Sequence, residues 1–149
     1  MNTLNKKIEL DQLNKIIISY NTKSLKETLI HANYSRSLLP NLNNIPQFHN
    51  IVGLINFRLN DLNQAMIHFK LAIKINPNFH TAYYNLGLVY FNTKDLNKSY
   101  DFLLEALNIK KDYKLARDKI IELLSFYKPD DNLKNKIFKL NEKIINIPS

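Results

Sequence analysis

Four histidines, His31, His49, His68 and His80, are the side chains of this sequence best suited to bind a metal or to transfer a proton. No two of them lie four residues apart, and none has a carboxylate at metal-ligand spacing. Zinc and iron sites need several converging nitrogen, oxygen or sulfur ligands, and the chain has no cysteine. We therefore expect no metal site and no disulfide, and we interpret His31 and His68 as packing or surface residues.

The residues of hydrolytic and phosphate chemistry also lack their usual contexts. Asp130 and Asp131 are adjacent acids at the expected start of a helix, where carboxylates favour the positive end of the helix dipole. The serines lack the flanking glycines of a nucleophile turn. The chain's only two glycines, 34 residues apart, cannot form a phosphate-binding loop. We therefore expect no enzymatic activity and no cofactor.

The composition is that of an ordered, helix-forming protein. The chain has 149 residues, of which 45% are hydrophobic and only two are glycine, so we expect one folded domain. The formal net charge is +8, but the cations are spread along the chain and mixed with acids. A nucleic-acid interface instead gathers its cations on one face. The sequence therefore favours a protein or peptide partner over RNA or DNA.

Targeting and membrane signals are weak. The first 18 residues contain lysines but no apolar core of signal-peptide length. Uninterrupted apolar runs such as 51–55 are much shorter than the ~20 residues that span a bilayer. We therefore expect a cytoplasmic protein with no membrane segment.

The dominant signal is an internal repeat over residues 46–113. Gly53 and Gly87 lie 34 residues apart, and when the sequence is aligned with itself at a shift of 34, many other positions also carry identical residues. The identical pairs are Leu54 with Leu88, Phe57 with Phe91, Asp61 with Asp95, Leu62 with Leu96, Asn63 with Asn97, Ala72 with Ala106 and Ile75 with Ile109. A fixed period of this length indicates a solenoid, in which one supersecondary unit stacks on its neighbours.

Each repeat unit is expected to form a pair of amphipathic helices, because apolar residues recur at three- and four-residue steps. Asp61 and Asp95 stand where the second helix of each unit should begin, and a short carboxylate there accepts from free backbone N–H groups. Ser24 is expected to cap a helix in the same way in an earlier unit. Because Gly53 and Gly87 each weaken a helix by about 1 kcal/mol, we expect them to permit close approach of the paired helix.

Residues 83–91, followed by Asp95, Ser99, Leu103 and Ala106, resemble the tetratricopeptide repeat (TPR), and 49–77 resembles a second copy. The resemblance implies an all-α solenoid of about eight helices in four antiparallel pairs, wound into a right-handed superhelix. We expect a single TPR domain over 1–149. It would comprise a degenerate repeat at 9–42, an insertion at 43–45, repeats at 46–79 and 80–113, and degenerate capping helices at 114–127 and 130–146.

In the resembling family, the first helix of each pair lines a concave groove. The matching residues of the two clear repeats are Asn50, Leu54, Phe57, Arg58, Tyr84, Asn85, Leu88, Phe91 and Asn92. The flanking positions add Leu13, Ile17, Tyr20, Asn21, Gln47, Thr81, Leu115, Asp118, Glu122 and Phe126. The apolar members are consistent with a groove for an extended peptide or a partner helix, and equally with packing inside the superhelix.

Three functions remain open on the sequence. The first is a non-catalytic scaffold that binds a protein or peptide in the groove. The second is the N-terminal repeat module of a larger enzyme of glycosyltransferase or sulfotransferase type, and the third is self-association through the outer helices. The family's carboxylate clamp for acidic chaperone tails is not expected, because neither register supplies the leading lysine: the corresponding places hold Asn50 or Leu13.

Overall fold

The computed structural model describes residues 3–22 and 24–126, and the structural statements below concern these residues. They form α1 (Thr3–Thr22), α2 (Leu25–Leu38), α3 (Pro46–Arg58), α4 (Leu62–Ile75), α5 (His80–Asn92), α6 (Leu96–Ile109) and α7 (Lys114–Phe126), with a 3-10 helix η1 (Pro40–Asn44). No strand occurs in this part of the chain. The all-α prediction is confirmed, whereas the helix expected at 130–146 falls outside the described residues.

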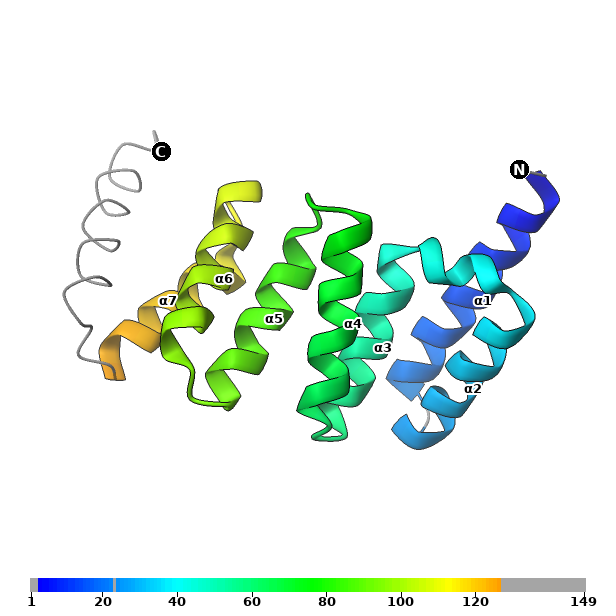
Figure 1. The fold of residues 1–149 in the computed structure, drawn as a ribbon, viewed down its shortest axis with the longest axis horizontal. Helices are drawn as coiled ribbons and strands as arrows, with labels where there is room; N and C mark the ends of the chain where they lie inside the picture. The colour runs from blue at the N-terminus through cyan, green and yellow to red at the C-terminus, as the bar shows by residue number, and fades with distance from the viewer. Residues whose placement is uncertain (1–2, 23, 127–149) are drawn as a thin grey trace.

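The helices stand side by side in a row that runs from α1 at one end to α7 at the other (Figure 1). The antiparallel partners α3 and α4 pack together most extensively, as do α5 and α6, while α4 and α6 each also pack on the first helix of the following unit. α1 and α2 form a further pair at the N-terminal end. Each unit therefore contacts mainly its neighbours, which is the arrangement of a solenoid.

Two helix starts are set by the predicted aspartates. The Asp61 carboxylate accepts a hydrogen bond from the backbone N–H of Gln64 at 3.1 Å. The Asp95 carboxylate accepts one from the backbone N–H of Lys98 at 3.2 Å. Both contacts satisfy a donor that has no partner within its own helix, so the two predicted N-caps are confirmed.

The first helix pair departs from this pattern. Ser24 precedes α2 but its side chain forms no capping hydrogen bond, so that prediction is wrong. The Thr28 hydroxyl instead donates to the Ser24 carbonyl oxygen at 2.9 Å and lies 3.0 Å from the Ser19 hydroxyl, which places it between α1 and α2. The inserted residues contribute to η1, where Leu42 is completely buried. The insertion is therefore a packed connection between α2 and α3.

The two glycines lie where paired helices approach closely. A Cβ atom on Gly53 would stand 2.6 Å from Cε1 of Phe69, and one on Gly87 would stand 2.9 Å from Cγ of Leu103. The Ser99 hydroxyl on α6 donates to the carbonyl oxygen of Gly87 on α5 at 2.9 Å. These contacts confirm the close approach that the glycine spacing predicted.

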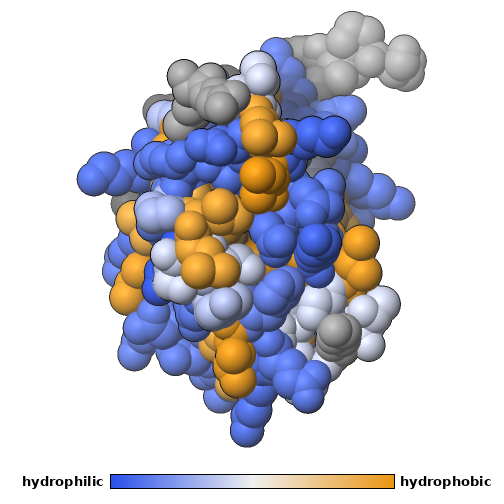
Figure 2. All heavy atoms as spheres, turned by 90° about the vertical axis from the view of Figure 1, so that its right-hand side faces the viewer, coloured by the Kyte–Doolittle hydropathy of each residue, from blue (hydrophilic) through white to orange (hydrophobic). Residues whose placement is uncertain are grey.

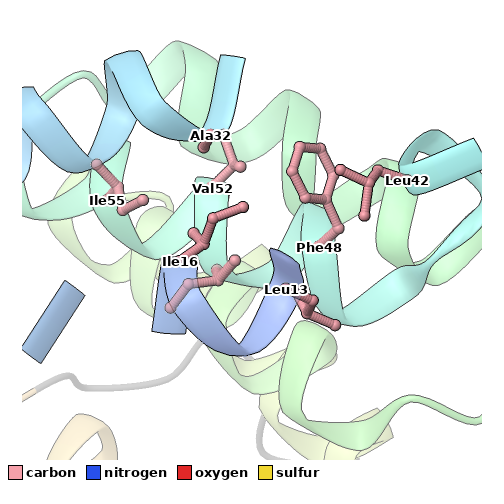
Figure 3. Close-up of a cluster of buried hydrophobic side chains, with 8 residues drawn as sticks. Leu13, Ile16, Ala32, Leu42, Phe48, Val52 and Ile55 are labelled. Carbon is pink, nitrogen blue, oxygen red and sulfur yellow. The ribbon is translucent and has the colours of Figure 1, made fainter. Parts of the chain in front are cut away.

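Three clusters of buried apolar side chains follow the row of helices. The N-terminal cluster joins α1, α2, η1 and α3 (Figure 3) and consists of Leu13, Ile16, Ala32, Leu42, Phe48, Ile51, Val52 and Ile55. The central cluster joins α4 to α5 and consists of Ala65, Phe69, Leu86, Val89 and Tyr90. The C-terminal cluster joins α6 to α7 and consists of Tyr100, Leu103, Ala106, Leu107, Ala116, Ile120 and Leu123.

The end of the molecule formed by α1 and α2 carries apolar side chains scattered between hydrophilic ones (Figure 2). Exposed apolar residues of these helices include Leu4, Leu10, Ile18, Ile30 and Tyr34. Within 3–22 and 24–126, no helix combines the length and the hydropathy needed to cross a membrane.

Candidate functional site

The nine residues predicted to line the groove divide between α3 and α5. Asn50, Leu54, Phe57 and Arg58 lie on α3, and Tyr84, Asn85, Leu88, Phe91 and Asn92 lie on α5. α3 contacts both α1 and α5, so these residues belong to a run of adjacent first helices. We call these nine residues, together with Tyr20 of α1 and Lys119 of α7, the first-helix face.

Two side-chain contacts tie α3 to its neighbours on this face. The Arg58 guanidinium carbon lies 5.0 Å from the centre of the Tyr20 ring on α1, a cation–π distance. The Asn85 amide on α5 donates to the Asn50 side-chain oxygen at 2.8 Å. Arg58 therefore links α3 to α1, and Asn50 links α3 to the buried Asn85 of α5, two pairings that residue spacing could not predict.

The apolar residues of the face are only partly exposed. Leu54 and Phe57 are half-buried: Leu54 packs against the N-terminal and central clusters, and Phe57 packs against the central cluster. Leu88 is also half-buried, and the exposed Asn92 donates its amide to the Leu88 carbonyl oxygen at 2.9 Å. Leu13, expected on the face, is instead buried in the N-terminal cluster because α1 packs that side onto α3. These apolar side chains therefore contribute to the buried clusters and also keep part of their area exposed on the face.

The end of the face near α7 combines aromatic rings with a charged pair. Lys119 Nζ lies 4.9 Å from the centre of the Phe91 ring and 2.6 Å from a carboxylate oxygen of Glu122. The rings of Tyr84 and Tyr113 meet edge to face, with their centres 5.4 Å apart. Burial raises the pKa of the Tyr84 phenol, and the nearby Lys119 charge opposes that rise. Tyr84 is therefore a neutral hydrogen-bonding group at neutral pH.

The chemistry available on this face is recognition. It offers the amides of Asn50 and Asn92, the Tyr84 phenol and half-buried rings, with the cation of Arg58 at one edge, whereas the Asn85 amide is buried and donates to Asn50. Amides satisfy peptide backbone groups and half-buried rings supply apolar contact area. Such a surface suits a polypeptide segment.

The structure contains a buried histidine pair that the sequence did not predict. His49 on α3 and His68 on α4 are 3% and 8% exposed, and their Nδ1 atoms lie 3.0 Å apart. His49 Nε2 also lies 3.0 Å from the Asn43 carbonyl oxygen. His68, interpreted from the sequence as a packing or surface residue, is buried, and its contact with His49 was not predicted because the two are 19 residues apart. The signal that could have revealed the pair is the position of His49 in the repeat, which in the resembling family holds an aromatic packing residue.

Burial is the main reason why the pKa of each histidine in this pair is lowered. For His49 the Asn43 carbonyl opposes the effect and the Arg36 charge adds to it. For His68 the charges of His49 and Arg36 add to burial, and the pKa falls to about 4. No group of three or more His, Cys, Asp or Glu side chains that could hold a metal ion occurs in the described part of the chain.

Comparison with known proteins identifies the repeats. Residues 53–94 match the family described as TPR repeat, and residues 80–113 match the family described as tetratricopeptide repeat. The chain is 24% identical over 119 residues to the uncharacterized protein ycf37 of Guillardia theta, covering 78% of this chain and 67% of that protein. It is 28% identical over 95 residues to the chloroplastic TPR domain-containing protein PYG7 of Arabidopsis thaliana, covering 62% of this chain and 32% of PYG7.

Solved structures share the fold. The first TPR of Spaghetti (RPAP3), bound to the HSP90 peptide SRMEEVD, superposes with a TM-score of 0.70 at 16% identity, covering 78% of this chain and 90% of that one. An O-GlcNAc transferase mutant of Thermobaculum terrenum gives a TM-score of 0.76 at 17% identity, covering 88% of this chain and 25% of that one. From the two matched segments we conclude that residues 53–113 are made of tetratricopeptide repeats, and the solved structures show that the chain shares the fold of TPR domains.

Proposed function

We propose that this chain is a non-catalytic protein-interaction scaffold that binds an extended peptide or a partner helix along the first-helix face. The observation that carries the proposal is the succession of half-buried rings and leucines beside side-chain amides on adjacent first helices. Binding sites for polypeptides combine apolar contact area with a few placed hydrogen-bonding groups. The proposed contact residues are Asn50, Leu54, Phe57, Arg58, Tyr84, Asn85, Leu88, Phe91 and Asn92.

The likeness to a TPR bound to the peptide SRMEEVD supports a peptide as the ligand class. At 16% identity that likeness extends to the fold, so the peptide sequence is not transferred to this chain. Asn50 and Leu54 occupy two places where a carboxylate clamp requires a lysine and an asparagine. We therefore propose a partner other than an acidic chaperone tail.

The test uses peptides selected by the protein itself from a displayed random library. The dissociation constant of a selected peptide is then measured for the wild-type chain and for the triple variant Phe57→Gln, Tyr84→Gln, Phe91→Gln. We expect at least about tenfold weaker binding, the size of a lost central contact. The matched control carries Asn63→Ala and Asn97→Ala, which are exposed on second helices, and should bind as wild type does.

Because the substituted rings are half-buried, a gentler variant accompanies the triple one. Asn50→Ala and Arg58→Ala together truncate two side chains of the face without opening an apolar cluster. Far-ultraviolet circular dichroism should remain helical for this pair, while peptide affinity falls. Unchanged affinity in both variants would place the binding site elsewhere.

A second candidate is that these repeats form part of a larger enzyme of glycosyltransferase or sulfotransferase type. It is favoured by the O-GlcNAc transferase likeness, in which this chain matches a quarter (25%) of the other protein. The test is to sequence the source transcript beyond the codon for residue 149. A continuous reading frame into a transferase domain would support this candidate, and an immediate stop codon would contradict it.

Self-association through the outer helices is a third candidate. Exposed apolar residues occupy equivalent places on two second helices: Ile30, Tyr34 and Leu38 on α2, and Ile67, Leu71 and Ile75 on α4. α4 also exposes Lys70 and Lys74, whereas α6 exposes Glu105 at the place equivalent to Leu71. A second copy related by two-fold symmetry would set α4 against α6 with opposite charges. Sedimentation over a wide concentration range should show mass that rises with concentration and is lost in Leu71→Lys.

A further inference from the structure

The His49–His68 contact joins several elements of the N-terminal half. His49 belongs to α3 and His68 to α4, and their Nδ1 atoms lie 3.0 Å apart. The other ring nitrogen of His49 lies 3.0 Å from the Asn43 carbonyl oxygen on η1. The charge that acts on both rings is that of Arg36 on α2. The pair therefore connects η1 to α3 and α4, with α2 close by.

Hydrogen-bond chemistry determines how protons are arranged in this pair. A carbonyl oxygen only accepts, so His49 Nε2 must carry the proton that it shares with Asn43. In neutral His49 the Nδ1 atom is then bare, and it accepts from Nδ1–H of His68. With both rings charged, two N–H groups would face each other across 3.0 Å, close to the Arg36 cation. The doubly protonated pair is incompatible with the closed arrangement.

We propose that His49 and His68 form a proton-sensitive latch that holds η1 and the α1–α2 pair against α3 and α4 and releases them when the histidines take up protons. The groups facing the pair are the Arg36 guanidinium from α2 and the Asn43 carbonyl from η1, while α3 and α4 supply the two rings themselves. Within the described residues, no carboxylate acts on either ring to compensate the added charge. Release would also shift Arg58 relative to Tyr20, which links α3 to α1 on the first-helix face.

The direction of the pH dependence follows from proton counting. An opened latch exposes both histidines, which then bind protons near their ordinary pKa of about 6.5. The closed latch binds fewer protons, with the pKa of His68 at about 4. Acidification therefore favours the opened form as the pH falls below 6.5, by up to about tenfold per pH unit for each additional proton bound. The effect levels off near the closed-state pKa.

The test is amide hydrogen exchange on the full chain, expressed as protection factors corrected for intrinsic pH effects, at about pH 7 and about pH 5. A chelator is present so that no adventitious metal occupies the imidazoles. In the wild type we expect protection of α1, α2 and η1 to fall at least tenfold between the two pH values, while α6 keeps its protection. His31→Gln on α2 is the matched control and should behave as the wild type does.

One variant and one spectroscopic measurement make the test decisive. The double variant His49→Phe, His68→Leu removes both titrating groups while filling the space with apolar side chains, and its N-terminal protection should no longer depend on pH. Nitrogen-15 spectra of the wild-type rings should show a proton on Nε2 of His49 and on Nδ1 of His68 at about pH 7. The latch is refuted if the double variant retains the wild-type pH dependence, or if both histidines titrate near 6.5 without loss of protection.

Discussion

At the scale of single residues, the side chain that Gly53 lacks has a definite consequence for stability. Its Cβ would lie 2.6 Å from Phe69 Cε1, and the Phe69 ring is completely buried, so it has little room to move. Gly53→Ala gains about 1 kcal/mol in helix propensity but incurs an overpacking penalty of about 1–3 kcal/mol. We expect a net loss of about 1 kcal/mol in unfolding free energy, measured by chemical denaturation.

A second substitution tests that explanation. Phe69→Leu should be less harmful in the Gly53→Ala background than in the wild type, because the smaller side chain relieves the clash. Asn63→Ala, an exposed position on α4, provides the control and should change stability by less than about 0.5 kcal/mol. If Gly53→Ala proves more stable than wild type, the two helices are farther apart than described here.

Tyr100 offers a second prediction at this scale. Its side chain is completely buried in the C-terminal cluster, and among residues 3–22 and 24–126 its hydroxyl has no hydrogen-bond partner. Tyr100→Phe removes an unsatisfied polar group, so we expect stability to rise by about 1 kcal/mol or to stay constant. A loss larger than about 1 kcal/mol in urea denaturation would indicate a polar partner for the hydroxyl.

The same residue predicts an alkaline effect. Burial, with a smaller contribution from the Asp101 charge, raises the Tyr100 pKa to about 12. The unfolded chain therefore loses this proton first, and stability falls as the pH rises from about 10 towards 12. Tyr100→Phe should lack this part of the loss in the pH dependence of the denaturation midpoint.

At the scale of elements, the turn between the two helices of each repeat needs a left-handed residue. Asn60 and Lys94 occupy equivalent places before the capping aspartates, with φ of 62° and 65°. Asparagine tolerates this conformation, whereas a residue such as lysine is disfavoured there by about 1–2 kcal/mol. The two repeats therefore share the same turn geometry, although only the first has a residue that tolerates it well.

Lys94→Gly should therefore stabilise the chain. We expect the thermal midpoint to rise by about 2–4 °C, a gain of up to about 1 kcal/mol, and Asn60→Gly to have a smaller effect. Lys70→Gly in the exposed interior of α4 should instead destabilise by about 1 kcal/mol. A lower midpoint in Lys94→Gly would mean that contacts of the lysine side chain stabilise the fold by more than the left-handed backbone conformation destabilises it.

At the scale of the whole molecule, the arrangement of the apolar clusters in a row predicts that a core substitution destabilises mainly the helices around its own cluster. Ile16 is completely buried in the N-terminal cluster, which joins α1, α2, η1 and α3. Ile16→Ala should reduce the stability of that region by about 2–4 kcal/mol. Because solenoid units are stabilised chiefly by nearest neighbours, hydrogen exchange should accelerate in α1 and α2 and change little in α6. Uniform acceleration along the chain would show that the row unfolds as one cooperative unit.

The sequence by itself determined the architecture of the repeats. The 34-residue spacing of Gly53 and Gly87 and the aspartates at 61 and 95 predicted paired helices, their starts and their close approach. These features are local: the helix period, a capping carboxylate and a missing Cβ act within one unit. They can therefore be read from residue types and their spacing.

Only the tertiary structure decided how residues from different helices meet. It paired His49 with His68 and Asn50 with Asn85, and it showed how far Phe57 is buried. Such contacts depend on the rotation and separation of packed helices, and at the N-terminal end on the folding of η1. Consecutive side chains on a helix point in directions that differ by about 100° around its axis. Small differences in how two helices pack can therefore change which side chain a residue contacts, while the repeat pattern of the sequence stays the same.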